Sequence, residues 1–227
     1  MKKMILLILF GLSSFSYAQE QLVVVVSSNL HATQGWMQRY EKNEIWAPIG
    51  SLSSVTLGRN GLGYAEDKYP LKIEGDGRSP LGLFSLKKAF GYSKTSPTKL
   101  SYEQADDTLY CVDDSEDPHY NQLLRLPVNS IMPKSYEVMH RADGVYQYGL
   151  VVEYNQERVK ERGSCIFIHL KHTDNHPTSG CTALDEADLI ELLHWINPEK
   201  NPQMLQVSMD ECRQYQKRFP GIRCQLP

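Results

Sequence analysis

The sequence predicts a mostly β protein of the α+β class with one principal helix. Gln21–Ser27 (QLVVVVS) is a β-branched run of strand length, and Tyr148–Tyr154 (YGLVVEY) and Cys165–Leu170 (CIFIHL) are two further apolar runs of that kind. A helical spacing of apolar residues is convincing at one place, Asp185–Ile196. Neither an internal repeat nor a linker divides the chain, which indicates a single domain.

The N-terminus has the pattern of a secretory signal peptide over residues 1–18. Lys2 and Lys3 form a short positive region, Met4–Leu12 is apolar, and Ser16–Ala18 supplies small residues for cleavage. The competing interpretation is a buried N-terminal helix. Because the apolar run is too short for a comfortable membrane anchor and no cysteine follows it, we expect a secreted, periplasmic protein without a lipid anchor.

Composition limits the classes of partner. The 227 residues carry 24 Lys and Arg against 27 Asp and Glu, a formal charge of −3, which becomes more negative once Lys2 and Lys3 are removed with the leader. A weakly acidic chain without a basic block argues against nucleic-acid binding. Outside the leader no segment reaches about 18 uninterrupted apolar residues, so we expect no membrane span in the mature chain. The sequence identifies no protein partner.

The first third of the mature chain predicts a small β-sheet. After Gln21–Ser27, the segment Met37–Gly50 predicts a hairpin with its turn at Lys42-Asn43. Ser54–Leu57 predicts a further strand, ended by the glycine-rich GRNGLGY. These three segments predict neighbouring strands.

A second glycine-rich segment follows, GDGRSPLGLFSLKKAFGY at 75–92. Gly75, Gly77, Pro80 and Gly82 predict tight turns, after which Leu81–Phe84 begins an extended segment. Residues 93–135 are loop-rich.

The last third holds the predicted helix and one more strand. Acidic residues occupy the first turn of Asp185–Ile196, and Pro198 closes the segment. The residues at near-helical spacing are Ala187, Ile190, Leu193 and Ile196. Met204–Val207 predicts a returning strand, and 208–227 is a polar tail.

Cys181 is the candidate nucleophile. It follows Gly180 and precedes the predicted helix, whose N-terminal partial charge stabilises a thiolate. His169, at the end of a predicted strand, is the candidate base. The backbone N–H groups around Gly180 and Cys181 could bind an oxyanion.

Zinc is the competing interpretation of the same stretch. His169, His172, His176 and Cys181 are four acceptable ligands. However, a pair that ends a strand and continues into a proline-bearing loop is not a recognised zinc spacing, and no second cysteine-rich knuckle accompanies it. We therefore expect no metal and no cofactor, with His172 and His176 as solvated loop residues.

These residues resemble a known family. His169 followed by Thr178-Ser179-Gly180-Cys181 is similar to the H…[S/T]-x-G-C signature of the YkuD-type L,D-transpeptidase catalytic domain. The segment 75–92 resembles the Pro-, Gly- and Phe-bearing segment of that family. GRNGLGY, CVDD and GSCIFIHL also look like an exported branch of it. The resemblance covers Gln21–Val207.

The resemblance implies a YkuD-like mixed sheet or sandwich over 19–207 that acts on peptidoglycan stem peptides. Cys181 would attack the amide between an L-centre and a D-residue, expel D-alanine and form a thioester, with His169 as general base and acid. It also implies substrate contacts around the site, at Thr178, Ser179, Thr182, Pro80 and Gly82.

One position departs from the family pattern. The family often has arginine two residues after the cysteine, where this chain has Ala183. An amine as acceptor would give a transpeptidase, and water would give an L,D-carboxypeptidase on the same scaffold. A non-catalytic wall-binding or effector module and a zinc peptidase are the alternatives from other classes.

The five cysteines predict two disulfides and one free thiol. If Cys181 stays free in an oxidising compartment, the other four allow three pairings. Cys212 and Cys224 flank a Pro220-Gly221 turn that can bring them together. That pairing leaves Cys111 with Cys165 and closes the 208–227 tail.

Overall fold

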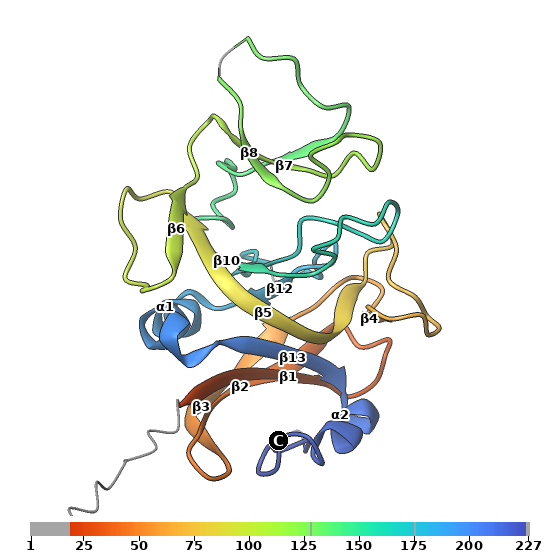
Figure 1. Cartoon of the computed structure of the whole chain (residues 1–227), viewed down its shortest axis with the longest axis vertical. Coiled ribbons are helices and arrows are strands. Elements are labelled where there is room, and N and C mark those ends of the chain that lie inside the picture. Colours follow the sequence, from red (N-terminus) through yellow and green to blue (C-terminus); the bar gives the residue numbers. More distant parts are fainter. Residues whose placement is uncertain (1–18, 128, 175, 226–227) are drawn as a thin grey trace, which may run out of the picture.

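The computed structural model, which describes residues 19–127, 129–174 and 176–225, is a mixed β-barrel that carries a smaller sheet and two short helices (Figure 1). The barrel order is β10–β11–β12–β3–β2–β1–β13–β5, and β5 pairs with β10 to close it. The mostly β prediction is therefore confirmed. The barrel strands are β1 (Glu20–Ser27), β2 (Gln34–Lys42), β3 (Trp46–Thr56), β5 (Ser79–Gly91), β10 (Tyr148–Val152), β11 (Phe167–Leu170), β12 (Thr182–Leu184) and β13 (Gln203–Ser208).

Strand β1 lies at the centre of the barrel wall. It pairs antiparallel with β2 and parallel with β13, and Leu22–Val26 are buried on both faces, as the continuous apolar run predicts. The segment after residue 208 covers the neighbouring hairpin: the N–H of Trp46 donates to the Pro220 carbonyl at 3.0 Å, and Phe219 packs edge-on against the Trp46 ring at 5.8 Å.

The predicted hairpin is present as β2 and β3, with Lys42 opposite Trp46. The separate strand expected at Ser54–Leu57 is wrong, because β3 runs without interruption to Thr56. A bulge between Met37 and Arg39 lets the long strand follow the curve of the barrel.

The loop-rich interpretation of 93–135 missed short strands. β6 (Ser101–Gln104) extends the barrel wall beside β5, as does β4 (Leu62–Tyr64) from the earlier glycine-rich segment. β7 (Leu109–Val112), β8 (Leu123–Arg125) and β9 (Tyr136–Val138) form the second sheet, which stands at the far end of the molecule from α2 (Figure 1). The predicted Cys111–Cys165 disulfide, with Cα atoms 6.0 Å apart, ties this sheet to the segment before β11.

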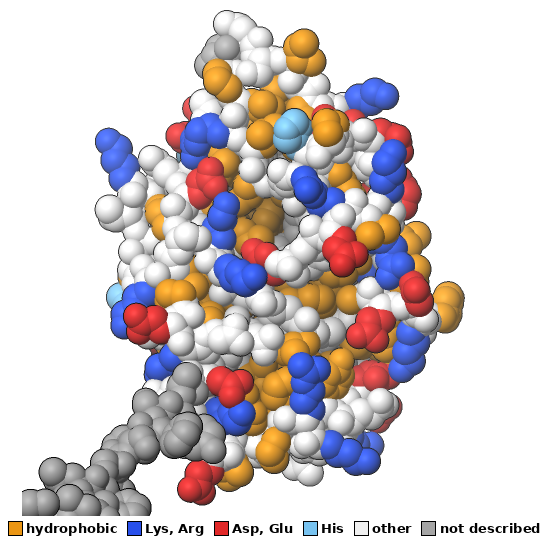
Figure 2. All heavy atoms as spheres, in the orientation of Figure 1, with side chains coloured by type: hydrophobic (Ala, Val, Ile, Leu, Met, Phe, Trp, Pro, Cys, Tyr) orange, Lys and Arg blue, Asp and Glu red, His pale blue; other side chains and the backbone are white. Residues whose placement is uncertain are grey.

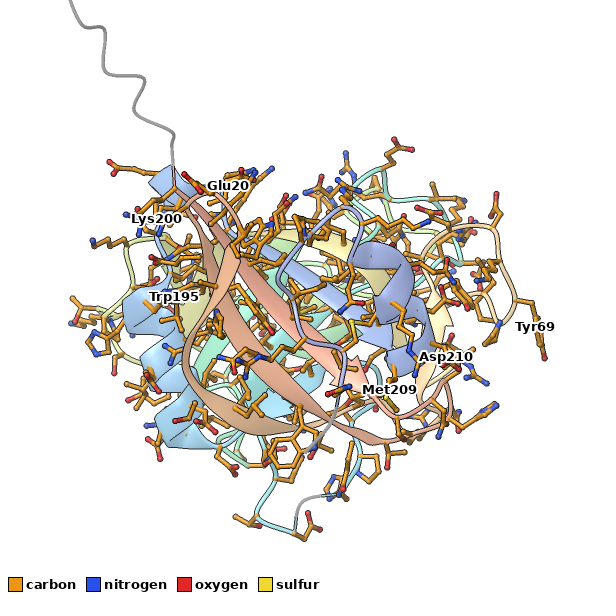
Figure 3. All side chains as sticks on the ribbon, turned by 90° about the horizontal axis from the view of Figure 1, so that it is seen from below. Glu20, Tyr69, Trp195, Lys200, Met209 and Asp210 are labelled. Carbon is orange, nitrogen blue, oxygen red and sulfur yellow. A yellow bond between two sulfur atoms is a disulfide. The ribbon has the colours of Figure 1, made fainter. Side chains whose placement is uncertain are left out.

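The predicted helix is α1 (Glu186–Trp195), with Asp185 as its N-cap residue. Its buried side is Leu189, Leu192, Leu193 and Ile196; Ala187 is exposed and Ile190 half-buried, so that part of the predicted apolar face was wrong. A short 3-10 turn, η1 (Pro198–Lys200), follows. Figure 3 shows Trp195 and Lys200 on the side of the barrel where Glu20 begins β1, away from Met209 and Asp210.

The polar tail contains a second helix, α2 (Met209–Tyr215). The Ser208 hydroxyl accepts a hydrogen bond from the Glu211 N–H at 3.4 Å, so Ser208-x-x-Glu211 was a capping signal present in the sequence. The predicted Cys212–Cys224 disulfide, with Cα atoms 5.6 Å apart, closes the tail.

Charges of both signs are interspersed over the face shown in Figure 2, without a large field of one sign. Within the described part of the chain, none of the helices is long and apolar enough to cross a membrane.

Candidate active site

Cys181 is the free cysteine among the described residues, and it lies directly before β12 with 7% of its surface exposed. Its sulfur accepts a hydrogen bond from the Phe167 N–H at 3.3 Å, and its thiol donates to the Cys165 carbonyl at 3.5 Å. The helix begins after Asp185, as predicted, and β12 separates it from Cys181. Because the dipole effect falls off within one turn, α1 does not stabilise a thiolate here.

His169 stands on β11, the strand parallel to β12. Its Nδ1 lies 2.8 Å from the carbonyl oxygen of Leu170. Since a carbonyl only accepts, Nδ1 carries the proton, and the lone pair of the neutral imidazole is on Nε2. The Tyr146 ring packs edge-on against the imidazole at 5.2 Å. The imidazole is thereby held in one tautomer and one orientation.

Burial favours the neutral forms of both Cys181 and His169. Burial raises the pKa of the Cys181 thiol to about 12, and the Glu137 carboxylate adds repulsion. Burial lowers the pKa of His169 to about 4. Both shifts follow from desolvation, which disfavours the charged form of either group. Burial therefore works against the thiolate that the helix N-terminus was expected to stabilise.

The loop before Cys181 is held by hydroxyl groups. The hydroxyls of Thr178 and Ser79 both donate to the Cys181 carbonyl, at 2.7 and 3.0 Å. Thr178 also accepts from the Gly180 N–H at 3.1 Å, so that N–H is already occupied. The N–H of Cys181 has no partner among the described residues, which leaves it as the oxyanion donor of the two expected groups.

Gly180 is required by geometry. Its φ is +146°, and a Cβ at this position would lie 2.9 Å from the Arg78 carbonyl oxygen. A larger residue would displace either the cysteine or the segment around residue 78.

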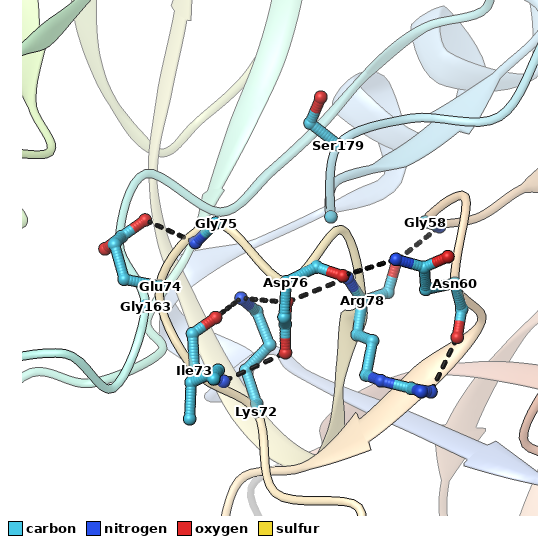
Figure 4. A network of polar contacts seen from close by, with 12 residues as sticks. Gly58, Asn60, Lys72, Ile73, Glu74, Gly75, Asp76, Arg78, Gly163 and Ser179 are labelled. Atoms are coloured by element: carbon cyan, nitrogen blue, oxygen red, sulfur yellow. Dashed lines mark hydrogen bonds and ion pairs between the residues drawn. The ribbon is translucent and has the colours of Figure 1, made fainter.

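That segment is anchored by Asp76, drawn in Figure 4. Its carboxylate accepts from the Lys72 ammonium at 2.8 Å and from the N–H groups of Ile73 and Arg78, both at 2.9 Å. Ser179 lies across from this loop in Figure 4, and the Arg59 guanidinium donates to its hydroxyl at 3.0 Å. The glycine-rich segment thus supports the cysteine loop from behind.

Three residues with expected substrate contacts lie elsewhere. The Thr182 hydroxyl donates to the Gln206 side chain at 2.6 Å, and Gln206 donates to the Pro80 carbonyl at 2.8 Å, a buried chain beneath Cys181. Gly82 lines a separate cavity with Tyr64 and Phe84. Their substrate-binding role stays a prediction.

The sulfur and imidazole face a pocket of about 190 Å³. Thr178 and Ser179 line it as expected, together with residues that sequence reasoning missed. The missed residues are Glu137, Arg141, Val145, Tyr146 and Pro177. His172 and His176 also line the pocket; His176 is exposed, as expected of a solvated loop residue, whereas His172 is half-buried. Glu137 is on β9 and Arg141 and Tyr146 lie between β9 and β10, where no short motif marks them.

The described residues contain one group that could hold a metal ion, His172, Asp174 and His176, whose ligand atoms lie within 4.8 Å of one another. The four residues weighed from the sequence, His169, His172, His176 and Cys181, line one pocket, but neither His169 nor Cys181 belongs to this close group of possible ligands.

A family model described as the L,D-transpeptidase catalytic domain (YkuD) matches residues 22–207. The chain belongs to the YkuD family. This membership confirms the resemblance read from the sequence, and the domain implies L,D-transpeptidase-type peptidoglycan crosslinking activity. A search of curated proteins finds no match.

Because the chain belongs to the YkuD family, alanine at position 183, where the family often has arginine, needs a structural explanation. Ala183 is buried in β12, where it pairs with His169 of β11 on one side and Thr56 of β3 on the other, so this position lies in the barrel wall and away from solvent. Arg141 is the arginine that lines the Cys181 pocket in this chain, and it comes from the segment after β9.

Proposed function

We propose that this YkuD domain transfers acyl groups from peptidoglycan stem peptides through a thioester on Cys181. The supporting observation is that Cys181 and His169 share one pocket, with Nδ1 of His169 held by the Leu170 carbonyl and Nε2 left as the base. The sulfur would attack the amide that follows an L-centre, and D-alanine would leave.

Proton transfer and attack are coupled in this mechanism, because a free thiolate is unfavourable in the buried site. The thiol turns from the Cys165 carbonyl toward Nε2 of His169, which takes the proton as sulfur attacks. The N–H of Cys181 stabilises the tetrahedral oxyanion. The imidazolium then gives its proton to the departing amine, and the thioester remains.

Intact mass after incubation with a tetrapeptide muropeptide tests the proposal. We expect an adduct equal to the donor less D-alanine on wild type and none on Cys181→Ala. Muropeptide binding without an adduct would favour the non-catalytic wall-binding module. Turnover that EDTA abolishes and Cys181→Ala retains would favour the zinc peptidase. Products separate the acceptors, since a crosslink requires an amine and a tripeptide requires water.

We also propose that the protein works in the periplasm, where its substrate lies. Two disulfides among the described residues support an oxidising compartment. The expected leader, 1–18, lies outside the described residues. Fractionation of cells with and without residues 1–18 tests the location: full-length protein should be recovered outside the cytoplasm in a shortened form.

A further inference from the structure

The pocket of Cys181 contains two opposite charges that do not pair with each other. Glu137 and Arg141 both line it. Each acts on the Cys181 thiol, Glu137 raising its pKa and Arg141 lowering it, and each acts on the other. Within the described ranges no ion pair joins Glu137 to Arg141; the partner of Arg141 is Asp143. Both charged groups therefore line the cavity of about 190 Å³ that a ligand would enter to reach Cys181.

The guanidinium of Arg141 is fixed by Asp143 but has one nitrogen without a hydrogen-bond partner among the described residues. Its Nε donates to both carboxylate oxygens of Asp143, at 3.0 and 3.1 Å, and Nη2 also binds Asp143. The guanidinium lies over the Tyr146 ring, 5.3 Å from its centroid. Nη1 has no partner among the described residues, so the side chain can still donate to a carboxylate.

Only one carboxylate oxygen of Glu137 accepts a hydrogen bond within the described residues. Its Oε2 accepts from the Tyr146 hydroxyl at 2.6 Å, and Oε1 has no partner in the described part of the chain. Burial raises the pKa of this carboxyl to about 7. A cation that entered the pocket would lower that pKa again and be bound by the carboxylate.

We propose that Glu137 and Arg141 form the acceptor subsite, which binds a head group that carries an ammonium and a carboxylate on the same carbon. Glu137 binds the ammonium and Nη1 of Arg141 binds the carboxylate. The inference rests on the proposed function, because it needs a thioester on Cys181. It concerns what resolves the thioester: an α-amino acid group held beside the acyl carbon competes with water by proximity.

The step balances without a further reactant. The ammonium gives one proton to the Glu137 carboxylate and becomes a nucleophilic amine. The amine nitrogen bonds to the acyl carbon, the C–S bond breaks, and the second proton passes through His169 to the leaving sulfur. The products are the new amide, the Cys181 thiol and protonated Glu137, which loses its proton to solvent.

The test starts from the acyl-enzyme made with a tetrapeptide donor. It compares D-methionine with D-methioninamide, which keeps the amine and lacks the carboxylate. The readout is the ratio of new amide to hydrolysed tripeptide by mass spectrometry. For wild type we expect the ratio of new amide to tripeptide to be about tenfold or more higher with D-methionine than with D-methioninamide, which is the usual contribution of a charge-assisted hydrogen bond. Without a binding site, D-methioninamide would be the better acceptor, because a larger fraction of its amine is unprotonated at neutral pH.

Variants then assign the two charges. Arg141→Gln should remove the preference for D-methionine over its amide. Glu137→Gln should lower the amide-to-tripeptide ratio about tenfold or more with both acceptors. Glu116→Gln, an exposed change in the loop after β7, and Arg213→Gln, an exposed change on α2, are the matched controls and should keep the wild-type ratios.

Equal ratios for the two acceptors in wild type would overturn the subsite even if a variant failed to fold. So would a preference that survives in folded Arg141→Gln, or a ratio unchanged in folded Glu137→Gln. These outcomes leave the thioester mechanism standing. Failure of wild type to form any acyl-enzyme refutes the proposed function, and the subsite with it.

Discussion

The sulfur of Cys181 accepts a hydrogen bond from the backbone N–H of Phe167 at 3.3 Å. Phe167 and His169 are two residues apart on β11, so their side chains lie on the same face of the strand. The strand that carries the His169 imidazole therefore also positions the Cys181 sulfur. Movement of β11 would disturb both groups together.

Removal of either group should separate their roles. Cys181→Ala should form no acyl-enzyme, because no nucleophile remains, and should keep the barrel fold. His169→Ala should acylate about 10²–10⁴ times more slowly, the usual contribution of a general base. Intact mass against time measures both, with circular dichroism as the control. Normal turnover by folded Cys181→Ala would contradict the assignment.

Alkylation of Cys181 should be slow at neutral pH and rise toward pH 12. The reason is the raised pKa of the buried thiol, since only the thiolate reacts. Glu137→Gln should speed iodoacetamide labelling by removing a repulsive charge, whereas Glu116→Gln should not. A labelling rate that already levels off below pH 7 would show that the pair is ionised at rest.

The buried imidazole should make stability depend on pH. The pKa of His169 is about 4 in the folded protein and near 6.5 when unfolded, so the unfolded state binds more protons between these values. Its contribution, about 3 kcal/mol, is complete above pH 6.5 and is lost as pH falls toward 4. Urea unfolding across this range should show a smaller loss in His169→Gln than in wild type. Parallel curves would contradict the prediction.

Two glycines should respond differently to alanine. Gly180→Ala places a Cβ 2.9 Å from the Arg78 carbonyl and should reduce acylation per folded molecule, because the cysteine loop must move. At Gly82 the nearest atom to an added Cβ is the Phe84 ring, at 3.0 Å, in a cavity away from Cys181. Gly82→Ala should lower stability and retain acylation. Lost acylation in folded Gly82→Ala would support the original expectation that this position borders the site.

The disulfides should also differ in effect. In the chain-entropy model, the loop of 54 residues between Cys111 and Cys165 contributes about 4 kcal/mol and the loop of 12 between Cys212 and Cys224 about 3 kcal/mol. The double serine variant at 111 and 165 should lose acylation as well as stability, because the Cys165 carbonyl contacts the reactive thiol. The variant at 212 and 224 should lose stability alone. The comparison uses thermal melts and acylation rates; equal acylation by both would contradict it.

Local patterns predicted those parts of the fold that depend on local chemistry. The apolar run of β1, the apolar spacing and N-terminal acids of α1 and the turn of the β2–β3 hairpin are each visible in a few residues. The motif around His169 and Cys181 singled out the chemistry for the same reason. The charged groups facing Cys181 were not predictable, because Glu137 and Arg141 reach the pocket only through the tertiary placement of the small sheet. Their sequence context is an ordinary short strand and turn.

The parallel pairing of β1 with β13 has a consequence for how the protein is made. Leu22 lies opposite Gln203 and Val26 opposite Val207. One edge of β1, the first described strand, therefore forms its backbone hydrogen bonds only when β13, the last strand, is present. A chain that emerges from its N-terminus keeps the edge of Leu22–Val26 unpaired until almost every residue is available. Such high contact order predicts slow closure, and a bare β-branched edge is prone to self-association meanwhile. Productive folding should therefore depend on shielding this strand throughout chain emergence.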